Sequence, residues 1–579
     1  MSVAEMHEFF HKGIAAGKVR LSLPDHASGY LVCLSILTLF YSAFILLKSW
    51  QRKDPFRVPY TLPILKNTIP FVFDGLNFLR DAKARLPYGS TMVVPIFRED
   101  IYLVQGPKNV AEMFHSPQLT ITRSWSLVLR QCFGMKQRAV DAYLADTSGT
   151  REKPIPGSNP RPQDRLSHMT HKNLTAGLLQ NSSLGPATDR YREHLEQSLD
   201  EMGIGHDWAY MPDMTEFLQT HIGSSLIRTL FGERLLSQNP DFISDLWEYD
   251  EHVMSLAQRY PRIWIPKTYS IRDRLLAAVK KWHAEAVKND EVSEFDDGKL
   301  TDSWWGTKMM KERYRLLLGG TGQDEDSVAS TNLAFIWSSV TTVVPSSATM
   351  VTKLFSSEAE PLLSSLRTSL SRLPPSPTVK ELESVPLLVS AYAETLRYGI
   401  HIHVPRSAPH HELQVQGVTI PKNSLILLNT QLAHTDEEVW DNHDGRHPLD
   451  QWCPERFLVD PKDPSSGPTR TKTAVAAEKA EKAEGGPYFS SEGLEGAWFP
   501  YGGGQHACPG RLLAKRIMLL TSAMLISNFD IEIRAGKEAL EFGSPRFGFG
   551  VSKPSGPVPF RIRRRNHVCK AECAYFIDT

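Results

Sequence analysis

Apolar residues recur with helical spacing along several long stretches of this chain. The four clearest stretches are residues 187–201, 326–355, 379–398 and 510–528, and the spacing predicts a helix over each of them. The segment 404–430 instead combines β-branched residues with Pro, Gly and Asn, which predicts short strands joined by turns. No internal repeat of roughly 20 to 50 residues is visible. The pattern therefore predicts one large globular domain that is mainly α with a small β subdomain.

The longest uncharged apolar run lies at residues 27–47, near the N-terminus. Its length matches the roughly 20 residues that a helix needs to cross a bilayer. The 26 residues before it are largely polar and no small-residue cleavage site follows it, so a signal peptide fits poorly. We therefore expect a tail at 1–26 and one N-terminal transmembrane helix at 27–47. Four Lys or Arg residues follow the run closely and three precede it, which favours a cytosolic body.

Proline content and composition divide the rest of the chain. Three prolines within residues 48–66 prevent a helix there and predict a stiff extended linker. A globular body is expected at 67–565, followed by a C-terminal tail at 566–579. Two polar stretches within the body, 146–164 and 461–486, are rich in Pro and Gly or of low complexity, so we expect surface insertions without chemistry.

Charge and cysteine content exclude several classes of protein. The chain has 65 Lys+Arg against 65 Asp+Glu and no block of like charge, so nucleic acid is not expected as a partner. Its 6 Cys residues are too sparse for a disulfide framework, and no Cys-x-x-Cys pair offers a zinc clamp. The composition is typical of a reduced intracellular compartment.

The strongest candidate site is the glycine-rich loop 501–510 (YGGGQHACPG), which directly precedes the predicted helix 510–528. Glycines allow the backbone to approach a flat ligand closely. Backbone N–H groups at a helix start stabilise a thiolate, which suits Cys508 as an axial ligand of haem iron. A glycine-rich turn that happens to hold a buried cysteine is the alternative.

This loop resembles the haem-binding loop of the cytochromes P450, whose pattern is aromatic-x-x-Gly-x-basic-x-Cys-x-Gly. Tyr501, Gly504, His506, Cys508 and Gly510 occupy the patterned positions. The family's usual Phe is Tyr501 here and its usual Arg is His506, which keeps a partner of variable charge for a haem propionate. The resemblance implies the cytochrome P450 fold and a heme b cofactor whose iron is ligated by Cys508.

A second pattern, Glu394-x-x-Arg397, puts both side chains on one helix face. By itself it is weak, because Glu312 and Arg315 satisfy it too. It gains weight from its place before the loop and from Pro454-Glu-Arg456-Phe, which is similar to a family segment whose Arg completes a buried triad. The resemblance therefore implies a structural triad of Glu394, Arg397 and Arg456 that holds the haem loop.

Contacts to the haem propionates are less well defined. Arg406 resembles the family's basic residue at this place, and its guanidinium would suit a carboxylate; an exposed strand Arg is the alternative. The family's Trp-x-x-x-Arg helix, which usually supplies another contact, is missing. His168, His171 and Lys172 lie in the corresponding segment, where one of them could substitute or all three could be solvated.

The helix 326–355 corresponds to the family helix that crosses the oxygen face, where an acid and an alcohol usually move protons to dioxygen. Here no acid follows its first residue, and Trp337 and Pro345 appear instead. This form is similar to the sterol 7-hydroxylase and prostacyclin-synthase branch. Pro345 predicts a kink. Thr341 and Thr342 are the nearest candidates for the catalytic hydroxyl, although each could bond only to its own helix.

Taken together, the resemblance implies a haem-thiolate monooxygenase of the endoplasmic reticulum membrane, in contact with membrane lipid and with its catalytic domain in the cytosol. Its substrate would be lipophilic, of sterol, terpenoid or polyketide type. No flavin or nicotinamide fingerprint is present, so electrons should come from an NADPH-dependent flavoprotein reductase docked near Arg511, Lys515 and Arg516. The missing acid leaves open an isomerase or dehydratase that needs no reductase. A non-catalytic haem-binding protein is a third reading.

Overall fold

The structure is a computed structural model that describes residues 32–33, 35–44, 57–60, 62, 64–290, 301–471, 486–541 and 547–566. Helices dominate it. The α-helices of the body are α3 (Thr68–Phe73), α4 (Gly75–Ala84), α5 (Pro107–His115), α6 (Thr122–Gln131), α7 (Gln137–Ala145), α8 (Leu166–Leu179), α9 (Asn181–Asp200), α10 (Met214–Phe231), α11 (Glu233–Ser237), α12 (Phe242–Ala257), α13 (Pro266–Lys288), α14 (Lys308–Arg315), α15 (Glu325–Leu354), α16 (Glu360–Leu370), α17 (Val379–Glu383), α18 (Pro386–Gly399), α19 (Thr430–His434) and α21 (Arg511–Asn528).

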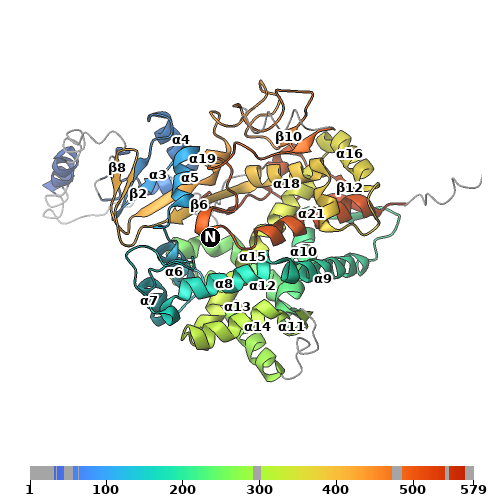
Figure 1. The fold of residues 1–579 in the computed structure, drawn as a ribbon, viewed down its shortest axis with the longest axis horizontal. Coiled ribbons are helices and arrows are strands. Elements are labelled where there is room, and N and C mark those ends of the chain that lie inside the picture. The colour runs from blue at the N-terminus through green and yellow to red at the C-terminus, as the bar shows by residue number, and fades with distance from the viewer. Residues whose placement is uncertain are drawn as a thin grey trace, which may run out of the picture.

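Strands form a small second part, as the sequence pattern predicts. They are β1 (Met92–Ile96), β2 (Glu99–Leu103), β3 (Ala209–Met211), β4 (Thr301–Asp302), β5 (Gly306–Thr307), β6 (Ile400–Arg406), β7 (Leu413–Val415), β8 (Val418–Ile420), β9 (Leu425–Asn429), β10 (Leu458–Val459), β11 (Tyr488–Phe489), β12 (Phe529–Ile533), β13 (Phe549–Val551) and β14 (Phe560–Arg564). The largest sheet has the order β1-β2-β9-β6-β13, and β12-β14-β3 form another. Figure 1 shows β2, β6 and β8 on one side of the molecule and helices α8 to α15 on the other.

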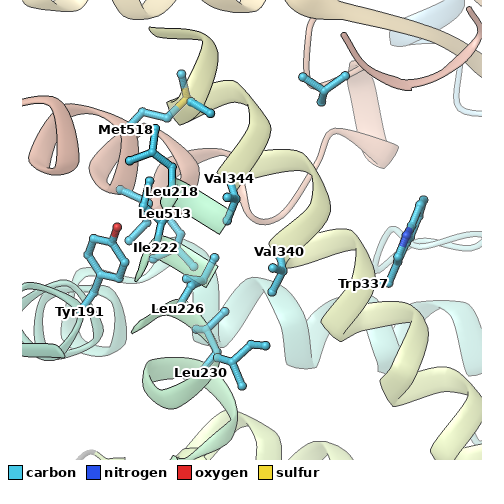
Figure 2. Packing of buried hydrophobic residues seen from close by; sticks show 14 of the residues in the cluster. Tyr191, Leu218, Ile222, Leu226, Leu230, Trp337, Val340, Val344, Leu513 and Met518 are labelled. Carbon is cyan, nitrogen blue, oxygen red and sulfur yellow. The ribbon is translucent and has the colours of Figure 1, made fainter. Parts of the chain in front are cut away.

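The central element is α15, which packs against α10, α13, α18 and α21. Val340 and Val344 point from α15 towards apolar side chains of α10, whereas Trp337 lies on the other side of the helix (Figure 2). Between residues 327 and 352 only a few positions keep partial exposure. A helix that is apolar on nearly all sides belongs in the core, and α15 therefore divides the interior.

Three of the four predicted helices are confirmed as single elements: α9 covers most of 187–201, α15 covers most of 326–355, and α21 covers most of 510–528. The fourth prediction, one helix over 379–398, is wrong. Two helices, α17 and α18, lie there, and the second begins at Pro386. The ring of a proline disfavours helical backbone at the preceding residue, so the helix ends and restarts.

The described part of the apolar run 27–47 is an exposed helix at Ser35–Phe44 together with residues 32–33. Among the described residues, α15 alone is long and apolar enough to cross a bilayer, and 72% of its most apolar window is buried inside the protein. It is a core helix. The tail 1–26, most of the linker 48–66 and nearly all of 566–579 lie outside the described residues, so the transmembrane helix stays a prediction.

The two expected surface insertions differ from each other. Residues 472–485 of the second stretch lie outside the described residues. The first stretch, 146–164, is not wholly superficial, because Asp146, Ser148 and Ile155 are each less than 5% exposed. Asp146 accepts hydrogen bonds from the backbone N–H groups of Ser148 and Ser167, so this loop starts α8. Asp146 thus pairs with backbone donors, whereas the charged residues at 151–153 face water.

Candidate haem site

The loop 501–510 is held in shape by glycine and by a close neighbour, Phe114 of α5. Gly504 has φ +64°, and a Cβ atom there would lie 1.9 Å from the Phe114 carbonyl oxygen, so only glycine fits. Cys508 N–H donates to the Tyr501 carbonyl (2.9 Å), which closes the loop directly before α21. Every residue of the loop keeps part of its surface exposed although it lies between buried elements. The loop therefore borders open space.

The Cys508 thiol has the surroundings of a metal ligand. Burial raises the pKa of the Cys508 thiol, while the backbone N–H groups of Gly510 and Arg511 and the Arg511 charge act in the opposite direction. Donors that point at sulfur favour the thiolate form. A Cβ atom on Gly510 would meet the Cys508 Sγ at 3.8 Å, which is ordinary contact, so Gly510 leaves the sulfur uncrowded.

Behind the loop, the predicted triad is present and completely buried. Glu394 accepts two hydrogen bonds from Arg397 (2.7 and 2.8 Å) and lies 3.2 Å from Arg456 Nε. All three side chains are 0% exposed. The two guanidiniums donate their remaining N–H groups to backbone carbonyls of residues 434 to 451. A buried ion pair whose other donors are also satisfied fixes a conformation more than it adds stability.

One histidine that the sequence reasoning missed joins this triad to the loop. His434 Nδ1 lies 3.2 Å from the Arg397 carbonyl, and His434 Nε2 accepts from the Phe499 N–H (3.2 Å) just before the loop. Burial, with a smaller effect of the Arg397 charge, lowers the pKa of His434 to about 3. The imidazole is therefore neutral, with its proton on Nδ1.

Arg406 ends strand β6 beside the loop and is 3% exposed. Its guanidinium donates to the carbonyls of Gly503 (2.9 Å) and Pro405 (2.8 Å) and lies over the Phe114 ring. Burial lowers the pKa of Arg406 to about 10. Within the described part of the chain no carboxylate pairs with it. A buried cation without a counter-ion calls for an external anion, which a haem propionate would supply.

Comparisons with known proteins agree with this site. The family model "Cytochrome P450" matches residues 167–560. The chain belongs to the cytochrome P450 family. The monooxygenase fsoE of Humicola fuscoatra is 30% identical, over 90% of this chain and 89% of its own length, and efuG of Hormonema carpetanum is 28% identical over 89% and 90%. A cyanobacterial P450 with bound retinoic acid, CYP120A1, shares the fold with a TM-score of 0.59 at 17% identity, covering 88% of this chain and 99% of its own.

Family membership confirms an oxidoreductase with a cysteine-ligated haem, and Cys508 is the cysteine of the matching loop. The sterol 7-hydroxylase branch has weak support: mouse cytochrome P450 7B1 is 22% identical over 94% of this chain and 98% of its own length. The residues present fit a haem. The Arg406 guanidinium donates to the Gly503 carbonyl of the loop that carries Cys508, so the thiol, the loop and this buried cation lie together.

This P450 lacks the Trp-x-x-x-Arg motif, and residues before and within α8 instead hold the haem loop by hydrogen bonds to its backbone. The Gln505 carbonyl accepts from Thr150 Oγ1 (3.0 Å) and lies 3.3 Å from His171 Nε2. His168 Nδ1 in turn lies 2.8 Å from the Thr150 carbonyl, whereas Lys172 is exposed. Of the three candidate residues, only His171 contacts the backbone of the haem loop, and His168 contacts Thr150, which in turn bonds to the loop. Thr150 lies in the loop before α8, which the sequence analysis assigned to a surface insertion, so its contact with the haem loop was not predicted.

His506 and Tyr501 are largely surrounded by protein, although each keeps part of its surface exposed. Burial lowers the pKa of His506 to about 3, with a smaller effect of the Arg406 charge, so this residue is neutral where the family usually has a cation. Its Nε2 lies 3.3 Å from the Leu119 carbonyl. The Tyr501 hydroxyl lies 3.0 Å from that of Tyr392 on α18, and burial raises the pKa of both. The aromatic residue therefore ties the loop to the triad helix.

One face of α15 opens towards space. Between residues 327 and 352 only Ser338, Ser339, Thr342 and Val343 are partly exposed, at spacings of one and four that place them side by side. Thr342 Oγ1 donates to the Ser338 carbonyl (2.7 Å). Thr341 is 2% exposed, and its Oγ1 donates to the Trp337 carbonyl (2.9 Å). Of the two candidate threonines, only Thr342 lies on the open face, and the sequence did not indicate the serines.

Proposed function

We propose that this P450 is a membrane-anchored monooxygenase that oxidises a lipophilic substrate with dioxygen and electrons from an NADPH-dependent flavoprotein reductase. The observation that carries the proposal is the pairing of the Cys508 loop, rigidly backed by a buried triad, with a partly exposed hydroxyl face on α15. When bound, the thiolate-ligated haem supplies dioxygen activation.

Each residue of the site has a part in this reading. Cys508 would bind the iron and Arg406 would pair with a propionate, whereas the neutral His506 uses its one N–H on the Leu119 carbonyl. Gly504 and Gly510 belong to the loop that would hold the haem, and Tyr501 holds this loop against α18. On the opposite side, the Thr342 hydroxyl accepts or passes a proton. It can do so because its oxygen keeps a free lone pair while its hydrogen bonds to Ser338.

The substrate class follows from the surroundings of the site. The partly exposed face of α15 carries Ser338 and Ser339 on one turn and Thr342 and Val343 on the next, and the other positions between residues 327 and 352 are buried. The described part of α15 has no acid between Asp326 and its C-terminal end. A wall of this kind favours a large apolar molecule with few polar groups, such as a sterol, terpenoid or polyketide.

Electron delivery requires a partner, because the chain carries no dinucleotide fingerprint. The three candidate docking residues are not equally available. Lys515 pairs with Glu383 (2.7 Å) and Arg516 donates to Asn181 (2.9 Å). Arg511 donates to the Cys508 carbonyl (3.1 Å), which puts one cation directly above the ligand. An acidic reductase surface would meet Arg511 first.

Anchoring in the endoplasmic reticulum membrane is part of the proposal. Phe40 in the helix Ser35–Phe44 is 74% exposed, and a second group of exposed apolar side chains extends from the end of the linker into α3, where Ile64 is 70% and Phe73 71% exposed. Groups of large apolar side chains that are exposed in this way fit a lipid environment. Asn181, which begins an Asn-Ser-Ser site and is exposed, reports orientation. A cytosolic body predicts that a glycosidase leaves the mass of the expressed chain unchanged; a mass shift would reject that orientation.

A haem-thiolate isomerase or dehydratase is the second candidate, since the hydroxyls of Thr341 and Thr342 both donate to their own helix. Such an enzyme rearranges an already oxygenated substrate and needs no external electrons. Turnover of candidate lipids with and without NADPH and reductase separates the two enzymes. A monooxygenase forms no product without them, whereas an isomerase converts a peroxide substrate in their absence.

The central experiment tests the ligand. The reduced carbonyl complex of the parent protein should show the red-shifted Soret band of thiolate ligation, and Cys508→Ala should lose it. Cys453→Ala is the matched control. Its thiol is also partly buried, but the contact of Cys453 with Glu394 is made by the backbone N–H, which the substitution keeps. If Cys508→Ala shows the same band as the parent protein, Cys508 is not the iron ligand.

A further inference from the structure

A second buried carboxylate, Asp250 of α12, lies against the middle of α15. Asp250 is 0% exposed. Its Oδ1 accepts a hydrogen bond from Trp337 Nε1 (2.9 Å), and its Oδ2 lies 2.9 Å from Lys553 Nζ. The lysine forms an ion pair with the carboxylate and also reaches Glu251, which is 57% exposed. One acid thus joins α12, α15 and the chain that follows β13.

Trp337 is enclosed by partners from three other elements. Its ring centroid lies 5.6 Å from that of Phe133, after α6, and 5.8 Å from that of Phe549 on β13. Aromatic neighbours at this separation fix the plane of an indole, and the bond to Asp250 fixes its rotation within that plane. Trp337 is therefore a side chain with one available orientation.

The turn of α15 that carries Trp337 needs such an anchor. Pro345 has no N–H, so the carbonyl of Thr341 loses its usual helix donor four residues later. Ser339 donates its hydroxyl to the Phe335 carbonyl (2.7 Å), and Thr342 donates to Ser338. Back-bonding of this kind bends helices. The backbone alone therefore leaves the direction of this segment loosely determined.

We propose that Asp250 is a positioning residue: by holding the Trp337 indole, it sets the turn of α15 that presents Ser338, Ser339 and Thr342 to the oxygen side of the haem. The helix that carries these hydroxyls has no acid of its own beyond its first turn. The acid instead comes from α12 and acts through the tryptophan. This inference rests on the proposed placement of the α15 face beside the haem.

The test uses the reduced carbonyl complex of the full chain, whose C–O stretching band responds to polar groups around the bound gas. Trp337→Phe removes one N–H and keeps most of the ring. Asp250→Leu removes the acceptor at similar volume. Both variants should shift the band in the same direction, and the double variant should shift it no further, because they break the same contact. Asp250→Asn should keep the parental band, since its amide oxygen accepts from Nε1.

Two comparisons make the outcome decisive. Glu251→Gln, next in the chain and exposed, removes only the outer partner of Lys553 and should leave the band unchanged. Thr342→Val removes a hydroxyl from the proposed face and should shift the band directly. A parental band in Trp337→Phe overturns the positioning role, whether or not Asp250→Leu folds. A parental band in Thr342→Val instead shows that the face lies elsewhere, which is a failure of the proposed function.

Discussion

The two sides of this haem site are built in opposite ways. On the cysteine side, the Glu394 carboxylate is bonded to groups that are distant in the chain, including Arg456 and the Cys453 N–H. On the α15 side, the hydroxyl groups of the open face bond only to carbonyls of their own helix. Long-range bonds fix the cysteine side independently of substrate. The α15 side is positioned by packing and by the bond from Trp337 to Asp250, and packing can change from one relative to another without loss of the fold.

The largest effect should come from breaking the triad. Glu394→Gln keeps the shape but leaves two fully buried guanidiniums without a carboxylate. Removing one partner of a buried charge cluster costs about 3–5 kcal/mol, a large part of a typical unfolding free energy of roughly 5–15 kcal/mol. We expect a much lower thermal midpoint and a loss of haem per protein chain, measured by absorbance and calorimetry.

The chain provides a matched control for this prediction. Glu312 and Arg315 satisfy the same Glu-x-x-Arg spacing, but both side chains are exposed. Exposed pairs contribute little, about 0–1 kcal/mol. Glu312→Gln should therefore behave as the parent protein. Equal midpoints for the two Gln variants would show that the buried triad does not hold the cysteine side.

The next effect should appear at Arg406. Arg406→Met keeps the length of the side chain and removes the cation. Hydrogen bonds to charged groups contribute about 1.5–3 kcal/mol, so haem should pass to an acceptor globin on the order of tenfold to a hundredfold faster. Arg98→Met, at an exposed turn, is the control. An unchanged transfer rate in Arg406→Met would mean that the guanidinium pairs with no group of the haem.

The contrast between the two sides also explains what the sequence could predict. Cys508, Glu394, Arg397 and Arg456 were predicted because the loop and the two motifs before it resemble those of the P450 family in type and order, whereas the Glu-x-x-Arg spacing alone recurs at Glu312 and Arg315. His434 was missed, since nothing near it in the chain shows that it bridges Arg397 and Phe499.

The same limit applies to other residues that the sequence analysis did not single out. Thr150 and Asp250 act through partners far along the chain, at Gln505 and Trp337. Pro386 was a local indication of a helix break, but the helical spacing of apolar residues on both sides of it led to the prediction of one continuous helix. The order of elements and the cysteine side thus follow from pattern, whereas tertiary contacts that complete the site do not.

A smaller effect should sharpen the account of the cysteine side through pH. In the folded protein the pKa of His434 is about 3, so the imidazole stays neutral as the pH falls to that value, whereas an unfolded histidine takes a proton near pH 6.5. The unfolded state therefore binds more protons below pH 6.5, and stability falls as pH falls from there towards 3. The slope from this group is at most about 1.4 kcal/mol per pH unit.

Other buried histidines add to this slope, so a difference between variants is the informative quantity. His434→Gln should lower the thermal midpoint at neutral pH, because it loses one of two bonds, and should make the decline below pH 6.5 shallower. His252→Gln, at an exposed position of α12, should change neither. A slope in His434→Gln as steep as that of the parent would remove His434 as the link between triad and loop.

The smallest effect, and the one that tests the α15 side, concerns the two threonines. Thr342 lies on the open face, whereas Thr341 is 2% exposed and faces the core. With the reductase supplied, Thr342→Val should lower the ratio of product formed to NADPH oxidised by several-fold. General acid help is typically worth 10²–10⁴-fold, but water can replace part of a missing hydroxyl. Thr341→Val should stay within about twofold of the parent, because its hydroxyl serves only the Trp337 carbonyl. A loss of coupling in Thr341→Val alone would mean that α15 rotates when substrate binds. The two sides of the site would then differ in motion as well as in hydrogen bonding. Parental coupling in both variants would assign proton delivery to water or to the substrate.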